Sequence, residues 1–152
     1  MGSGPQCKGC PLETIGKGFV PGHGPADATV AIIGSVPDEA DVTSGYPLTG
    51  TTWATLVRDF LPFSGIDTEE IYRDHVIRCR PAKAMKSGAQ RASVIPQGKL
   101  LADAIAHCSQ YDTYLATITL LIPLGKAALT KFSTESFESR RGHLLEGENT
   151  NG

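Results

Sequence analysis

The sequence predicts an α/β fold in which a central, mostly parallel sheet of four strands is flanked by helices. Two observations support this prediction. Short apolar runs rich in β-branched residues recur along the chain, and segments with helical spacing of apolar residues separate them. Strands that alternate with helices usually lie parallel in one sheet with helices on both faces. At 152 residues the chain has room for one buried core, so we expect a single domain over 1–152.

Four segments are predicted to form the sheet. The first, 29–34, is an apolar, β-branched run that ends in Gly34, as expected of a buried central strand. The other three are 71–78, 117–124 and an outer strand over 139–146. In open α/β sheets ligands bind beyond the carboxyl ends of the strands, so we expect chemistry in the loops that follow the first three strands.

Helices are predicted over 53–60 and 99–109, where apolar residues recur every three or four positions, and a short helix is expected over 125–131. Residues 1–27 are rich in glycine and proline and are predicted to be mostly loop. The segment 147–152 is a polar tail without core-forming residues.

Composition restricts the classes of function. The formal net charge of −2 gives no overall attraction to nucleic acid or to a membrane surface, so any such binding depends on local patches. No apolar run reaches the length of a membrane span, and the first residues lack the apolar core of a signal peptide. We therefore expect a cytoplasmic protein in a reducing compartment, where four cysteines indicate metal ligation or redox chemistry before disulfides.

The four cysteines are the strongest candidates for a functional site. Cys7 and Cys10 form a Cys-x-x-Cys-Pro pair in a glycine-rich loop, and Cys79 and Cys108 follow far downstream. Two thiolates spaced in this way can bind one metal centre from a single turn, and the fold must bring in the other two. A redox pair, or the packing of Cys108 as a buried apolar side chain, are the alternatives. Spacing alone does not distinguish zinc from an iron–sulfur cluster.

Seven short motifs follow one another along the chain: Cys-Lys-Gly-Cys-Pro-Leu at 7–12, Gly-His-Gly-Pro-Ala-Asp-Ala at 22–28, Gly-Ser-Val-Pro-Asp at 34–38, Gly-Tyr-Pro-Leu-Thr-Gly at 45–50, His-Val-Ile-Arg-Cys-Arg-Pro at 75–81, Leu-Gly-Lys-Ala-Ala at 124–128 and Arg-Gly at 141–142. In this order they resemble the iron–sulfur (family four) uracil-DNA glycosylases. The resemblance implies a uracil-DNA glycosylase-like fold. It also implies a [4Fe-4S] cluster that supports the structure and the DNA-contacting loops, with the four cysteines as its ligands.

The chain departs from the family pattern at the catalytic positions. An acidic residue follows the first glycine of the family motif, and here that position is Ser35. Asp38 is the nearest carboxylate, and it has a second interpretation as a residue that caps or turns the loop. The family's last strand carries a His-Pro-Ser motif that this sequence lacks. The catalytic candidates are therefore Ser35, Asp38 and His75.

The resemblance also implies a base pocket formed by four residues: Gly34, Tyr46, Leu48 and His75. Leu48 stands where the family has an aromatic side chain that stacks on the base, and Tyr46 is a possible substitute for it. His75 replaces the asparagine that recognises the edge of uracil. A histidine can donate from one nitrogen and accept at the other, but it cannot reproduce the paired contact of an amide.

The segment 78–99 contains six basic residues and no acidic residue. Its DNA-binding candidates are Arg80, Lys83, Lys86 and Arg91. One interpretation is a loop that contacts phosphates and is anchored at both ends by the cluster ligands Cys79 and Cys108, and the other is a solvated surface loop.

Three functions remain open at this point. The favoured one is an iron–sulfur DNA-binding protein of this superfamily with lost or altered glycosylase activity, acting in DNA repair or replication together with other proteins of those processes. The second is an active DNA glycosylase that hydrolyses the N-glycosidic bond of uracil or another deaminated base. The third is a zinc-bound structural or interaction domain.

Overall fold

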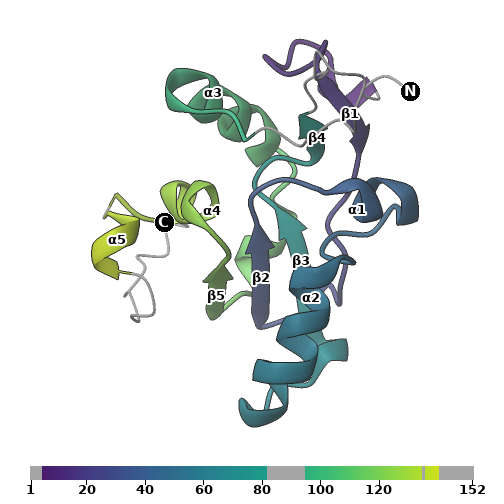
Figure 1. Ribbon diagram of the computed structural model, residues 1–152, viewed down its shortest axis with the longest axis vertical. Coiled ribbons are helices and arrows are strands. Elements are labelled where there is room, and N and C mark those ends of the chain that lie inside the picture. Colours follow the sequence, from purple (N-terminus) through teal and green to yellow (C-terminus); the bar gives the residue numbers. More distant parts are fainter. Residues whose placement is uncertain (1–4, 82–94, 135, 141–152) are drawn as a thin grey trace.

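The computed structural model describes residues 5–81, 95–134 and 136–140 of the chain. Its centre is a parallel sheet of three strands in the order β3–β2–β5, in which β2 (Val30–Gly34) lies between β3 (Ile71–His75) and β5 (Leu120–Pro123) (Figure 1). The α/β prediction is confirmed. The central strand is the β-branched run identified from the sequence, as expected of the most buried strand.

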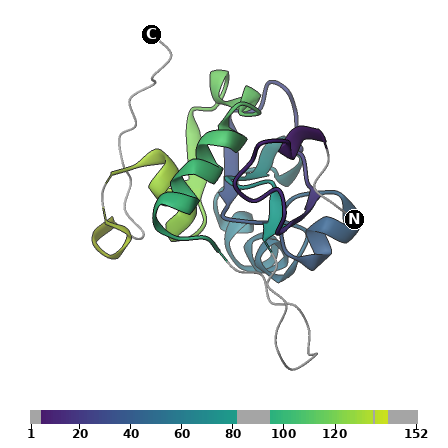
Figure 2. The same cartoon turned by 90° about the horizontal axis from the view of Figure 1, so that it is seen from above.

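Helices cover both faces of this sheet (Figures 1 and 2). Alternate residues of β2 point to opposite faces, so Ala31 and Ile33 belong to one core cluster and Ile32 to another. The first cluster includes residues of α3 (Gly98–Ser109) and α4 (Lys126–Phe132). The second is packed under α2 (Thr51–Thr55) and the π-helical turn that continues it, Leu56–Phe60.

A small second sheet lies beyond the carboxyl end of β3 (Figure 1). Strand β1 (Gly16–Phe19) pairs antiparallel with β4 (Cys79–Pro81), with Phe19 opposite Cys79. This pairing joins the N-terminal segment to the chain that leaves β3. The remaining short elements are η1 (Pro5–Cys7), α1 (Glu39–Ser44), η3 (Leu61–Phe63), η4 (Thr68–Glu70), η5 (Thr113–Ala116) and α5 (Phe137–Arg140).

The structure changes several predicted boundaries. The predicted strand 71–78 ends at His75, and the chain then turns before the separate strand β4. The predicted fourth strand, 139–146, is not observed: its first two residues belong to α5, and the rest lies outside the described residues. Residues 1–27, predicted as mostly loop, include β1. None of the helices in the described ranges is long and apolar enough to cross a membrane.

A buried ion network connects the main sheet to the segment around Cys108. Arg78, which is 1% exposed, pairs with Asp74 of β3 and with Asp112, 2.8 Å away, and Lys131 of α4 also pairs with Asp112. The guanidinium of Arg78 donates a hydrogen bond to the carbonyl oxygen of Cys108 as well. Buried charges of this kind are tolerated only when they are paired and hydrogen-bonded.

Candidate functional site

A cavity of about 200 Å³ lies at the carboxyl ends of β2 and β3, where ligands bind in open α/β sheets. The parallel register places Gly34 beside His75 at this edge. The lining residues come from the two strand ends and from the loops and helices that follow them: Gly34, Ser35, Val36, Asp38, Asp41, Leu48, Gly50, Thr52, His75, Ile95 and Leu124. The structure therefore brings together five of the sequence-predicted site residues, and Tyr46 is not among them.

His75 and Asp41 form a buried pair in the wall of this cavity. Nε2 of His75 lies 2.9 Å from Oδ2 of Asp41, and both side chains are 3% exposed. Asp41 was not among the predicted site residues, because it lies in the loop expected after the first strand and its partner is 34 positions away. The spacing between Asp38 and Asp41 could have indicated a helix start here, because two short polar residues three positions apart are typical of a capping box.

Asp41 is held as a carboxylate by its hydrogen bonds. It accepts bonds from the Thr49 backbone N–H at 2.7 Å and from the Thr49 hydroxyl at 2.9 Å, and from the Asp38 backbone N–H at 3.2 Å. Burial alone would raise the pKa of Asp41, but the hydrogen bonds from His75, Thr49 and Asp38 outweigh it and lower the pKa well below its ordinary value. An ionised Asp41 can only accept, so it receives a hydrogen bond from the Nε2–H group of His75.

Replacing Asp41 with asparagine is expected to lower the free energy of unfolding near pH 7 by about 1–3 kcal/mol, because a buried charge-assisted bond to His75 is lost. The folded-state pKa of Asp41 is depressed, so its contribution is present above the ordinary aspartate pKa of about 3.9 and is lost as the pH falls through the lower folded value. Urea unfolding from pH 7 down to pH 2 measures this. The gap between wild type and Asp41→Asn should narrow below about pH 4. Asp27→Asn, at an exposed aspartate, is the control, and a gap that stays constant with pH would contradict the assignment.

The other ring nitrogen of His75 has no hydrogen-bond partner among the described residues, although it is buried. It lies beside Gly34, where a Cβ atom would be only 2.5 Å from Nδ1 and 3.1 Å from a methyl group of Leu48. A side chain at Gly34 would therefore collide with the imidazole, so the close approach of His75 requires glycine at this position. A buried acceptor or donor without a partner is uncommon in proteins and indicates a place where another group can bind.

The two candidate catalytic residues of the 34–38 motif have structural partners. The Ser35 hydroxyl donates to the carbonyl oxygen of Leu124 at 3.2 Å. The Asp38 side chain accepts from the Asp41 backbone N–H at 2.9 Å and so forms the N-cap of α1 in a capping box. Both residues line the cavity, but each has its hydroxyl or carboxylate engaged within the protein.

The two candidates for base stacking differ in position. Leu48 is buried against the cavity and has a left-handed backbone with φ of 56°, a conformation that costs energy for a residue other than glycine. Tyr46 is 50% exposed and packs edge-to-face on His23, with the ring centres 4.8 Å apart. The structure thus places Leu48, and not Tyr46, in the cavity wall.

The four cysteines are all buried and none forms a disulfide. Burial raises the pKa of Cys79 to about 12, and the neighbouring thiols of Cys108, Cys7 and Cys10 act in the same direction. The fold therefore gathers four thiols from three separate segments into one region. Burial also raises the pKa of Cys7, whereas the reactive thiol of a redox Cys-x-x-Cys has a lowered pKa.

The surroundings of these thiols suit a bound anionic group. The Leu12 backbone N–H points at Cys10 Sγ from 3.4 Å, and a Cβ atom at Gly16 would lie 2.7 Å from Cys79 Sγ. Backbone donors and close glycines are features that thiolate-bound clusters use. In the described part of the chain, no three or more His, Cys, Asp or Glu side chains are grouped so that they could hold a single metal ion.

The structure corrects part of the prediction for the basic segment 78–99. The charge of Arg78 is neutralised in the buried network and is not available to a phosphate. The guanidinium of Arg80 lies 3.5 Å from the carboxylate of Glu39. The ammonium of Lys99 pairs with Asp103, one helical turn further along α3. The described residues do not include the other three basic positions, Lys83, Lys86 and Arg91.

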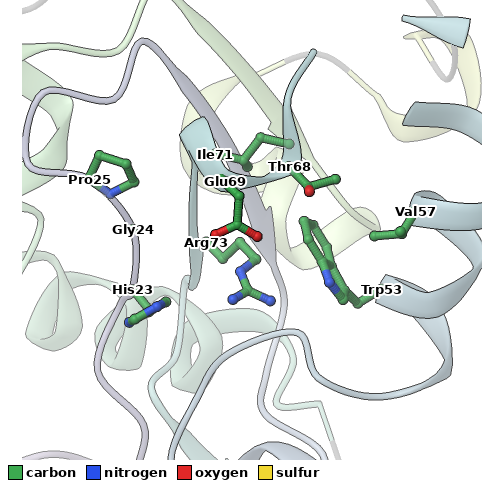
Figure 3. Close-up of a pocket in the computed structure, with 9 residues that line it drawn as sticks. All are labelled: His23, Gly24, Pro25, Trp53, Val57, Thr68, Glu69, Ile71 and Arg73. Atoms are coloured by element: carbon green, nitrogen blue, oxygen red, sulfur yellow. The ribbon is translucent and has the colours of Figure 1, made fainter. Parts of the chain in front are cut away.

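A second cavity, of about 280 Å³, lies beside the first half of β3 (Figure 3). The guanidinium of Arg73 lies 4.5 Å from the centre of the Trp53 ring, in a cation–π contact. Burial lowers the pKa of Arg73, and the carboxylates of Glu69 and Asp41 act against this shift. None of the sequence-predicted site residues lines this cavity.

No protein-family model matches the chain. It is similar to two curated proteins, both named type-4 uracil-DNA glycosylase. The one from Thermotoga maritima is 33% identical over 76 residues, which are 50% of this chain and 39% of the relative. The one from Archaeoglobus fulgidus is 29% identical over 76 residues, or 50% of this chain and 38% of the relative. The matches span less than two thirds of each relative, and they confirm the resemblance that the motif order indicated.

Proposed function

Because the chain is a relative of the type-4 uracil-DNA glycosylases over half its length, we propose that it is an iron–sulfur DNA-binding protein of that superfamily with lost or altered glycosylase activity. It acts in DNA repair or replication, alongside other proteins of those processes. Residues 1–152 work as one domain, in which 1–27 carry part of the cluster site. The cavity beside His75 receives a nucleobase turned out of the DNA stack.

The observation that supports binding without hydrolysis is the state of the polar groups around the cavity. Hydrolysis of a glycosidic bond needs a group free to orient water or to stabilise charge beside the sugar. The Ser35 hydroxyl donates to Leu124, and the Asp38 carboxylate caps α1. The Asp41 carboxylate receives four hydrogen bonds from within the protein. Ser35, Asp38 and Asp41 are thus each fixed in orientation by hydrogen bonds within the protein.

The cysteine region supports the cluster. Cys7, Cys10, Cys79 and Cys108 are buried together, with a backbone N–H directed at one sulfur and a glycine against another. The ligands of one zinc ion converge on a single point, whereas a cuboidal cluster is bound at its separate corners. The choice of a cluster over zinc rests on the similarity to the type-4 uracil-DNA glycosylases. When bound, the cluster would hold the N-terminal segment, β4 and α3 together.

The test has two parts, both with protein purified without oxygen. Binding to a fluorescent single-stranded oligonucleotide should be measurable and should weaken as salt increases, because phosphate contacts release counterions. Incubation of uracil-containing DNA, followed by alkali treatment, should yield no strand breaks above those of a protein-free sample. Absence of any DNA binding would overturn the proposal.

Contacts to phosphate are proposed for Arg80, Lys83, Lys86 and Arg91. Changing Lys83, Lys86 and Arg91 together to alanine should weaken DNA binding and reduce the salt slope by about 0.7 for each phosphate that is no longer neutralised. The control is Lys8→Ala, at an exposed lysine in the Cys7–Cys10 loop. A salt slope equal to that of the wild type would remove the basic segment from the interface.

A second candidate function is an active glycosylase with altered catalytic residues. The observation in its favour is the buried Asp41–His75 pair, because a carboxylate that fixes one imidazole nitrogen leaves the other able to act as a base. Abasic sites formed from uracil or hypoxanthine in DNA, and abolished by His75→Ala, would establish this function instead.

A further inference from the structure

The hydrogen-bonding character of the cavity can be worked out from its side chains. In a neutral imidazole only one nitrogen carries a proton. Asp41 is a carboxylate and can only accept, so the proton of His75 is on Nε2, which lies 2.9 Å from Oδ2 of Asp41. In this neutral form Nδ1 carries a free lone pair, and it has no partner among the described residues.

The other polar side chains in the cavity have the same character. The only proton of the Ser35 hydroxyl is directed to the Leu124 carbonyl, which leaves its oxygen as an acceptor. Asp38 offers carboxylate oxygens and no proton, and one of them lies over Gly50, where a Cβ atom would be 2.3 Å away. The cavity wall also includes Thr52, which is exposed. Among the described lining residues, its hydroxyl is the side-chain group that could donate a hydrogen bond to a ligand. The deep side chains of the cavity thus present acceptors.

An acceptor-lined cavity discriminates between bases that carry an amino group and bases that carry a carbonyl at the same ring position. An exocyclic amino group donates a hydrogen bond to Nδ1, whereas a carbonyl oxygen would place two lone pairs against each other. When the exocyclic group is the one that faces Nδ1, the carbonyl also leaves Nδ1 buried and unpaired, the situation that hydrogen-bonding sites reject most strongly.

We propose that this cavity selects an amino-bearing nucleobase, with Nδ1 of His75 as the acceptor and Asp41 as the positioning residue that fixes the imidazole. The inference rests on the proposed function, in which the cavity receives a base. It assigns the preference to the side chains of His75 and Asp41. His75 stands where the family has the asparagine that recognises uracil. An amide both donates and accepts, so the change from asparagine to a fixed histidine removes the donor that a carbonyl requires.

The experiment compares two matched pairs of bases, cytosine with uracil and adenine with hypoxanthine. Within each pair the exocyclic group changes from amino to oxo, and the adjacent ring nitrogen changes from an acceptor to an N–H donor. Each base is placed at the centre of an otherwise identical single-stranded oligonucleotide, with a 2′-fluoro sugar at that position to slow any hydrolysis. Affinities are measured at pH 8, above the ordinary histidine pKa of about 6.5. We expect the amino member of at least one pair to bind roughly tenfold more tightly than its oxo partner.

Variants assign the preference to the pair of residues. His75→Asn should remove the amino preference or turn it toward the oxo base, while binding to the DNA backbone persists. Asp41→Asn no longer fixes the proton on Nε2 and should reduce the preference. The control is His23→Asn, at an exposed histidine outside this cavity, which should leave the preference for the amino base unchanged. ¹⁵N NMR of His75 in the full-length protein provides an independent readout, with a proton on Nε2 and an unprotonated Nδ1 whose shift changes when the amino base binds.

Three outcomes would overturn the inference. If DNA binds but the oxo base is equal to or better than the amino base in both pairs, the inference fails and the proposed function stands. If none of the oligonucleotides binds, both fail together. A preference that persists unchanged in His75→Asn would also overturn the assignment to His75.

Discussion

Changing Arg78 to alanine is expected to lower the free energy of unfolding by about 3–5 kcal/mol. The side chain is 1% exposed and pairs with Asp74 and Asp112, both also buried. Its removal leaves Asp74 without its cation in a place that water does not reach, and desolvation of an unpaired carboxylate is costly. Among the described residues, Asp112 then keeps Lys131 as its one cationic partner. The substitution also removes the hydrogen bond to the carbonyl oxygen of Cys108, so the cysteine region loses a support at the same time.

Chemical unfolding followed by circular dichroism measures this effect. Arg58→Ala is the matched control, because Arg58 is exposed and pairs with its neighbour Asp59 on the surface, where ion pairs contribute little. Arg78→Lys should recover part of the lost stability, since an ammonium keeps the charge but cannot make the same set of bonds. Equal unfolding midpoints for Arg78→Ala and Arg58→Ala would contradict the role of the network.

Serine substitution of Cys79 or Cys108 is expected to abolish a bound iron–sulfur cluster. Each would be one of four ligands, and they come from β4 and α3, which the cluster would tie to the N-terminal segment. A group that binds only the folded chain stabilises it, so the free energy of unfolding should fall by on the order of several kcal/mol. The broad absorbance at about 400 nm that such clusters show should disappear as well.

Lys8→Ser serves as the control for the cysteine variants. It alters an exposed side chain between Cys7 and Cys10 and changes no thiol. Iron content, absorbance and unfolding are measured on the same anaerobic preparations. Retention of iron and of the absorbance in both the Cys79 and the Cys108 variant would show that these residues are not ligands.

The main sheet was predictable because its strands carry a local signal. The run from Val30 to Gly34 is apolar, β-branched and ended by glycine, and the structure places it at the centre of the sheet. The predicted fourth strand is not observed, because its first two residues belong to the helix α5 and the rest lies outside the described residues. The end of the strand β3 was not predicted correctly, because tertiary contacts decide that the chain turns after His75.

The site was predictable only in part, because sequence gives residue types but not their partners. His75 was identified from its motif, but the pair with Asp41 exists because α1 folds over the end of β3. Arg78 was counted within the DNA-contacting segment because composition shows charge and not burial. The cysteines were recognised by spacing, yet their proximity depends on the pairing of β1 with β4, a long-range contact that the sequence does not reveal.

The metal and sulfide content of the anaerobically purified chain tests the central claim most directly. The account predicts about four iron and about four acid-labile sulfide per chain, with no zinc, and loss of both in Cys79→Ser. One zinc per chain without iron or sulfide, in protein expressed with both metals supplied, would contradict it and support a zinc-bound structural domain instead.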